Sequence, residues 1–90
     1  MSYELVFTPK ALEGIEKLKK SGNIPLIKKL KTLLLELSEH PFNGTGQPEQ
    51  LKHDHAGFWS RRLNREHRIV YSVDQKIITV TVISVLGHYK

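Results

Sequence analysis

The chain has 90 residues, of which 39% are hydrophobic, and this suits one folded domain and excludes a disordered chain. Fourteen Lys and Arg against nine Asp and Glu give a formal net charge of +5. A small domain this basic attracts polyanions, commonly RNA or DNA, and acidic proteins are the alternative partners. The sequence contains no cysteine, which excludes disulfide frameworks, thiolate zinc sites and cysteine nucleophiles.

No segment has the pattern of a membrane span or of a signal peptide. The longest nearly apolar run, residues 77–86, is about half the length that a helix needs to cross a bilayer. The first residues, Met1 to Glu4, do not form a basic head that leads into an apolar stretch. We therefore expect a cytoplasmic protein with no membrane partner, folded as a single domain over residues 1–90.

Alternating apolar residues predict a first strand over residues 3–7. Thr8 and Pro9 then predict a helix start, because Thr caps helices and Pro is tolerated at the first helical position. The apolar stripe of this first helix consists of Leu12, Ile15 and Leu18. The Ser-Gly-Asn segment at residues 21–23 ends the helix, and Asn23 can cap a second one.

The second helix is predicted to run up to the step between His40 and Pro41, because the residue before a proline avoids helical geometry. Its buried face is expected to consist of Ile24, Ile27, Leu30, Leu34 and Leu37. The next segment, residues 41–57, is rich in Gly, Pro, Asn and Gln. Such a long connection in a small domain is usually functional or mobile.

Three further strands are predicted over residues 58–63, 67–73 and 77–85, where β-branched and aromatic residues are frequent. A turn at residues 74–76 separates the last two strands. Short connections of this kind imply an antiparallel meander. The order β-α-α-β-β-β therefore predicts an α+β fold, in which two N-terminal helices pack on one face of a curved antiparallel sheet.

Several short motifs follow one another in the second half of the chain. Residues 41–71 read PFNGTGQPEQLKHDHAGFWSRRLNREHRIVY, and His88 and Tyr89 stand before the final Lys90. This resembles the YoeB branch of the RelE toxin superfamily. The pattern of that branch joins a Pro-Phe and glycine-rich loop to P-E-x-L-K-H, G-F-W-S-R-R, E-H-R-[LI]-V-Y and a final His-Tyr. Lys90 is a departure from the pattern, and the resemblance implies a RelE-like toxin fold.

The resemblance implies an endoribonuclease in which the 2′-hydroxyl of RNA attacks the neighbouring phosphate, without a metal or another cofactor. Glu49 would be the general base, and it needs tight positioning because a carboxylate is a weak base at neutral pH. His88 would be the general acid, and Arg68 would hold the scissile phosphate and stabilise the transition state. The residues implied to support the same chemistry are Lys52, Arg61, Arg62 and Tyr89, the last by stacking on a base or donating its hydroxyl.

These residues also have purely structural interpretations. Glu49 could be a solvated loop carboxylate, Arg62 and Arg68 could be exposed strand residues or salt-bridge partners, and His88 and Tyr89 could belong to a frayed tail. Phe58 and Trp59 are more typical of packing than of base stacking, and Tyr71 is more typical of a core. Residues 53–55, His-Asp-His, suggest a metal site, but two histidines one residue apart need further ligands and no second cluster is evident. The lysines at residues 28–31 favour a solvated helix face over an RNA contact.

The resemblance further implies the toxin component of a type II toxin–antitoxin system, which cleaves messenger RNA in the ribosomal A site and inhibits translation. Its partners would be messenger RNA, the ribosome and a YefM-type antitoxin whose acidic, partly disordered segment covers the basic site. Operator DNA would be reached through the antitoxin, and toxins of this branch can form homodimers. The alternatives are a non-catalytic inhibitor on the same fold, as in the ParE toxins that target DNA gyrase, and a binding module or co-repressor.

Overall fold

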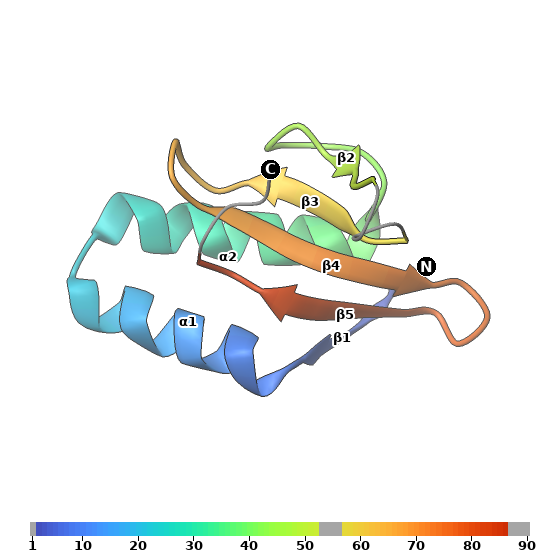
Figure 1. Cartoon of the computed structure of the whole chain (residues 1–90), viewed down its shortest axis with the longest axis horizontal. Helices are drawn as coiled ribbons and strands as arrows, with labels where there is room; N and C mark the ends of the chain where they lie inside the picture. The colour runs from blue at the N-terminus through green and yellow to red at the C-terminus, as the bar shows by residue number, and fades with distance from the viewer. Residues whose placement is uncertain (1, 53–56, 87–90) are drawn as a thin grey trace.

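Two helices and a five-stranded sheet make up the computed structural model, which describes residues 2–52 and 57–86 (Figure 1). The elements in chain order are β1 (Glu4–Phe7), α1 (Pro9–Ser21), α2 (Ile24–Glu39), β2 (Glu49–Gln50), β3 (Trp59–Arg62), β4 (Arg68–Asp74) and β5 (Thr79–Ser84). The α+β class and the predicted order are confirmed, and β2 is an additional short strand within the segment expected to be a loop.

Local capping sets the helix boundaries as the sequence predicts. The Oγ1 atom of Thr8 accepts a hydrogen bond from the backbone N–H of Ala11 at 3.1 Å, which caps α1. Gly22 follows α1 with a positive φ of 74°, the left-handed conformation that commonly ends a helix. The side chain of Asn23 then accepts from the N–H of Leu26 at 3.2 Å and starts α2. The two helices therefore form a hairpin with a minimal connection.

The sheet has the strand order β1-β5-β4-β3-β2 and is mixed rather than wholly antiparallel. The predicted antiparallel meander of β3, β4 and β5 is confirmed. The first strand, β1, joins β5 in parallel, with Leu5 opposite Val80. Short connections dictate antiparallel pairing only between strands that follow one another, and almost the whole chain separates these two strands. For that reason this pairing could not be predicted from local sequence patterns.

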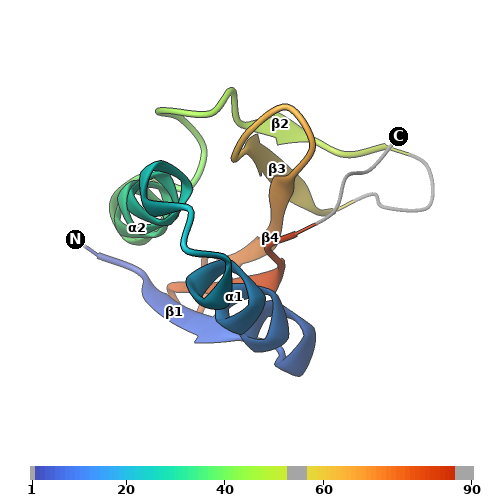
Figure 2. The ribbon, with the colours of Figure 1, turned by 90° about the vertical axis from the view of Figure 1, so that its left-hand side faces the viewer.

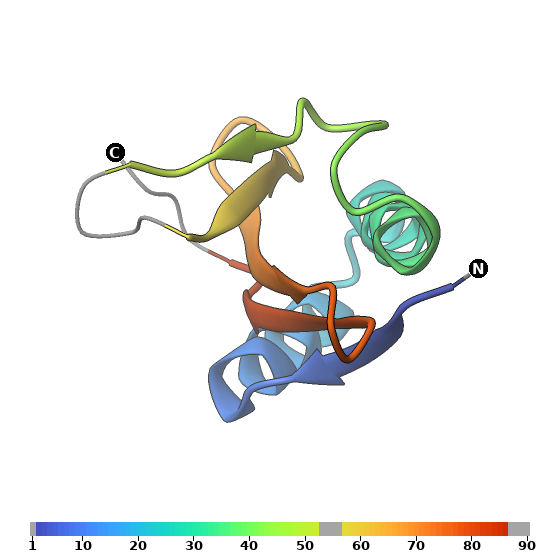
Figure 3. The ribbon, with the colours of Figure 1, turned by 90° about the vertical axis from the view of Figure 1, so that its right-hand side faces the viewer.

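The core lies between the two helices and the curved sheet, and the two edge-on views show how these layers are arranged (Figures 2 and 3). Leu30, Leu33 and Leu37 are the buried residues of α2; Leu33 was not among the residues predicted for this face, and Leu34, which was, is only half-buried against the core. Ile24 was expected on the buried face but is 55% exposed, because it is the first residue of the helix. Neither helix within residues 2–52 and 57–86 is long and apolar enough to cross a membrane.

Candidate functional site

Strand β3 carries different chemistry on its two faces. Successive residues of a strand point to opposite sides, and the side chain of Arg61 points toward α2, where it contacts Glu36. Ser60 and Arg62 therefore lie on the face of the sheet away from the helices. The register places Glu49 of β2 opposite Ser60 and Arg68 of β4 opposite Arg62. We call this set of Glu49, Ser60, Arg62 and Arg68 the site face.

The centre of the site face is an ion pair. The Nη1 atom of Arg68 lies 3.8 Å from Oε1 of Glu49, and the exposed fractions of the two side chains are 19% and 60%. The same Nη1 donates a hydrogen bond to Oγ of the buried Ser60 at 3.2 Å. Arg68 is thus held from the sheet side, whereas the Glu49 carboxylate is open to a ligand. A carboxylate beside an arginine can accept a proton from one group while the arginine holds a neighbouring anion.

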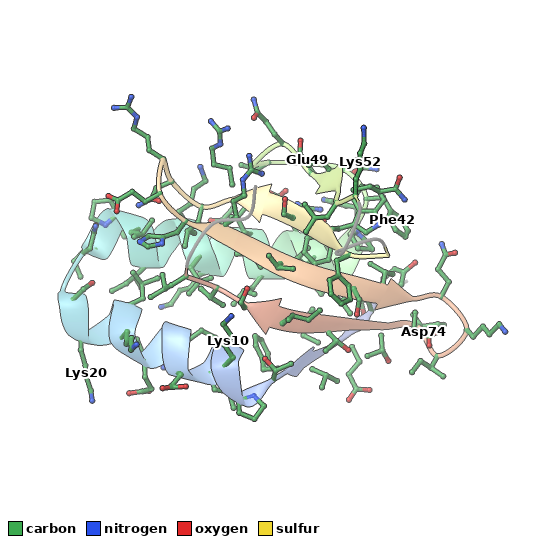
Figure 4. All side chains as sticks on the ribbon, viewed as in Figure 1. Lys10, Lys20, Phe42, Glu49, Lys52 and Asp74 are labelled. Carbon is green, nitrogen blue, oxygen red and sulfur yellow. The ribbon has the colours of Figure 1, made fainter. Side chains whose placement is uncertain are left out.

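The structure places the other predicted site residues at different positions. Arg62 and Lys52 are exposed, and Figure 4 shows the side chains of Glu49 and Lys52 projecting outward near β2. His88 and Tyr89 lie outside the described residues, as do residues 53–55, for which a metal site was weighed. The described part of the chain contains no group of three or more His, Cys, Asp or Glu residues that could hold a metal ion.

The prediction that Arg61 binds RNA phosphate is wrong, because this side chain is fully buried on the helix side of β3. Its Nη1 lies 3.0 Å from Oε1 of Glu36, and its Nε donates to the hydroxyl of Tyr71 at 3.2 Å. Its guanidinium also donates to three carbonyl groups of the loop, those of His40, Asn43 and Thr45. The Tyr71 hydroxyl in turn donates to the carbonyl of Pro41 at 2.7 Å. Tyr71 is a core residue, as predicted.

The buried network changes the acidity of two of its members. Burial raises the pKa of Glu36, but hydrogen bonds from Thr45 and the charge of Arg61 outweigh it, so the net pKa is lowered. Burial raises the pKa of Tyr71, and the hydrogen bond and charge of Arg61 only partly oppose this. Glu36 is therefore held as a carboxylate and Tyr71 as a neutral phenol. The role of Glu36 could not be predicted from the sequence, since its partner Arg61 lies 25 residues away.

The aromatic residues before Ser60 pack against the protein rather than stand free. The ring centroids of Trp59 and Phe42 are 5.1 Å apart with the planes at 58°. Trp59 is half-buried against the core. These contacts agree with the interpretation that Trp59 is a packing residue. They also join the start of the 41–48 loop to β3.

The same arrangement of a helical hairpin on a curved mixed sheet is found in solved structures of small bacterial toxins. A family model described as "YoeB-like toxin of bacterial type II toxin-antitoxin system" matches residues 7–89. The chain therefore belongs to the YoeB family of type II toxins.

Individual relatives agree with this assignment. Toxin YoeB of Escherichia coli strain K12 is 50% identical over 48 residues, which are 53% of this chain and 57% of that protein, so the match spans little more than half of the relative. A YoeB/ParE toxin from Agrobacterium tumefaciens is 36% identical, with a TM-score of 0.88 over 96% of this chain and 99% of the other. YoeB of Staphylococcus aureus, solved in a YoeB–YefM complex, is 34% identical, with a TM-score of 0.81 over 97% and 98%.

Proposed function

We propose that this toxin is an endoribonuclease that cleaves messenger RNA in the ribosomal A site and thereby inhibits translation. The observation that carries the proposal is the pair formed by Glu49 and Arg68, whose charged groups lie 3.8 Å apart on the open face of the sheet. A proton acceptor beside a phosphate-binding cation is what attack by an RNA 2′-hydroxyl requires. RNA brings its own nucleophile, so the protein needs no covalent intermediate.

In the first half of the reaction, the Glu49 carboxylate takes the proton of the 2′-hydroxyl while that oxygen attacks the adjacent phosphorus. Negative charge grows on the phosphoryl oxygens, and the planar guanidinium of Arg68 is suited to hold two of them. Phosphate and Glu49 compete for Arg68, so binding of the RNA draws the guanidinium away from Glu49 and leaves the carboxylate free to accept the proton. Ser60 keeps Arg68 oriented during this exchange.

In the second half, the bond from phosphorus to the 5′ oxygen breaks and that oxygen must be protonated. His88 is the proposed proton donor, since imidazole titrates near physiological pH. The products are a 2′,3′-cyclic phosphate on one fragment and a 5′-hydroxyl on the other, and no metal ion takes part. Tyr89 is proposed to stack on a base or to donate its hydroxyl near the scissile phosphate.

The exposed cations around the ion pair give the site its attraction for RNA. Arg62 lies directly opposite Arg68 in the β3–β4 register, and Lys52 follows β2 in the chain. Two arginines side by side repel each other, and a bound phosphate relieves that repulsion. We therefore propose that Arg62 and Lys52 bind the RNA backbone beside the scissile phosphate.

We also propose that an antitoxin of the YefM type neutralises this chain, because the similar toxin of Staphylococcus aureus was solved with YefM. A site face with exposed cations fits an acidic segment that folds on binding. Contact with operator DNA would then occur through the antitoxin. Staphylococcus aureus YoeB was also solved as a dimer, which makes a homodimer of this chain the expected free form.

The decisive experiment maps the 5′ ends of a defined message in a reconstituted translation reaction. The variants are Glu49→Gln, which keeps the shape of the side chain but cannot accept the proton, and Arg68→Lys, which keeps the positive charge but loses the paired N–H donors of the guanidinium. The matched control is Glu39→Gln at the exposed end of α2. We expect new ends within A-site codons for the parent and the control, and a loss of roughly 10²-fold or more for Glu49→Gln.

A folded parent that yields no new ends would contradict the nuclease proposal and favour a non-catalytic toxin, with gyrase tested next. Equal activity in the parent and in Glu49→Gln would contradict the role of Glu49 as general base but not the nuclease activity itself. Cleavage of the same message without ribosomes would contradict the proposed A-site action while leaving the chemistry in place.

A further inference from the structure

The loop between α2 and β2 has no regular secondary structure over residues 41–48, yet a buried cluster holds it in place. We call the side chains of Glu36, Arg61 and Tyr71 the loop clamp. The clamp binds the carbonyl groups of His40, Pro41, Asn43 and Thr45, and Glu36 also accepts a hydrogen bond from the Thr45 N–H at 2.7 Å. Nearly every second residue of the loop is therefore tied to a buried charge or hydroxyl.

Two glycines let the loop approach the clamp closely enough for these bonds. A side chain at Gly44 would place its Cβ only 2.4 Å from the Glu36 carboxylate and 3.1 Å from the guanidinium of Arg61. A side chain at Gly46 would meet the backbone carbonyl of Arg62 at 2.8 Å. Both glycines also have a positive φ, which side chains rarely adopt. The glycine-rich segment is thus shaped to fit the clamp.

The clamp matters to the site because the loop leads directly into β2. This strand has only two residues, so its own ladder is too short to fix its register on β3. The backbone N–H of Arg62 donates to the carbonyl of Gly46 at 2.6 Å, and the N–H of Leu51 donates to that of Phe58 at 2.9 Å, on either side of β2. A slip of one residue would turn Glu49 to the opposite face of the sheet and away from Arg68.

We propose that Arg61, acting with Glu36 and Tyr71, is a positioning residue that sets the register of β2 and so holds Glu49 against Arg68. The effect on catalysis rests on the proposed nuclease function, but the effect on register does not. Strand β3 therefore contributes to the site from both of its faces. Ser60 and Arg62 lie beside Arg68 and Glu49 on the site face, and Arg61 binds the loop on the helix side.

The test uses Tyr71→Phe, which removes one hydroxyl from the clamp and keeps the aromatic ring in the core. Ala11→Gly is the control, because it weakens α1 and the core without touching the clamp. Amide hydrogen exchange of the Arg62 and Leu51 N–H groups measures how often the two hydrogen bonds that flank β2 open. We expect these two amides to lose protection in Tyr71→Phe by at least 10-fold more than in Ala11→Gly. Equal protection in both variants would overturn the proposal.

The catalytic arm measures kcat and KM for RNA cleavage in a double-mutant cycle. A catalytic group misplaced by about 1 Å can cost on the order of 10²-fold, so Tyr71→Phe should lower kcat by roughly 10-fold or more with little change in KM. The same substitution in a Glu49→Gln background should have almost no further effect, because its action passes through Glu49. An undiminished effect in that background would overturn the positioning role.

The two arms separate the inferences. A parent that cleaves no RNA would refute the proposed function, and the exchange of the Arg62 and Leu51 amides would still decide whether the clamp sets the register. A parent that cleaves RNA, with both amides unchanged in Tyr71→Phe, would refute the clamp and leave the nuclease intact.

Discussion

Replacing Arg61 by Met should destabilise the fold more than any other single charge removal on β3. Met fills the space of the aliphatic stem, so the loss comes from the guanidinium. Its removal leaves the Glu36 carboxylate only 18% exposed and without its cation. Breaking a buried pair from one side costs about 3–5 kcal/mol. Asn43 and Thr45 are exposed, and water can replace Arg61 at their carbonyls, so we expect the lower end of this range.

The assay is urea unfolding followed by circular dichroism, with thermal unfolding as a second measure. A loss of about 3 kcal/mol corresponds to a fall in Tm of at least about 12 °C for a domain of this size. The control is Arg62→Met, the exposed neighbour, which should change the unfolding free energy by about 0.5 kcal/mol or less. Replacing both members of the pair, Arg61→Met with Glu36→Leu, should recover part of the loss. A cost for Arg61→Met within about 1 kcal/mol of that for Arg62→Met would refute the reasoning.

Three further predictions concern stability. The folded-state pKa of Glu36 is lowered from 4.5, so its carboxylate contributes stability above that pH that is lost as pH falls through the folded pKa. Glu36→Gln should therefore flatten the fall in urea midpoint as pH drops below 4.5, and an unchanged slope would contradict this. Gly46→Ala brings its Cβ to 2.8 Å from a β3 carbonyl, whereas a Cβ at Gly22 meets open space. Thermal unfolding should therefore show that Gly46→Ala lowers the free energy of unfolding by about 1 kcal/mol more than Gly22→Ala does, and equal losses would contradict this. Leu33 is 0% exposed, so Leu33→Ala should lower the unfolding free energy by about 2–5 kcal/mol. Leu35 is 64% exposed, so Leu35→Ala should lower it by less than about 0.5 kcal/mol, and similar losses in the two variants would contradict this prediction.

The helices and the meander could be predicted because their signals are local. The caps at Thr8 and Asn23 and the left-handed Gly22 act within a few residues, and each lies where the pattern placed it. The parallel pairing of β1 and the short strand β2 depend on contacts between distant segments. A two-residue strand leaves no periodic signal, so residues 49–50 read as loop until the register with β3 is known.

The site was predicted through its motifs, and the strand geometry then separated residues that the motifs treat alike. Arg61 and Arg62 are adjacent and chemically identical, but alternation along a strand sends them to opposite faces. The same alternation could have shown that Arg61 points inward with Trp59. Its partner Glu36 carried no such signal, because a lone glutamate on the polar side of a helix looks solvated until the loop folds over it.

The parallel pairing of β1 with β5 has a consequence for biosynthesis. The hydroxyl of Thr8, at the end of β1, donates to the carbonyl of Ile83, which lies 75 residues later in the chain. The helical hairpin can form as soon as it is synthesised, but β1 has no partner within the sheet until β5 has been made. Translation that stops before Thr79 would therefore release a chain that cannot complete its sheet. Incomplete translation products of this toxin should be substrates for proteolysis rather than active fragments.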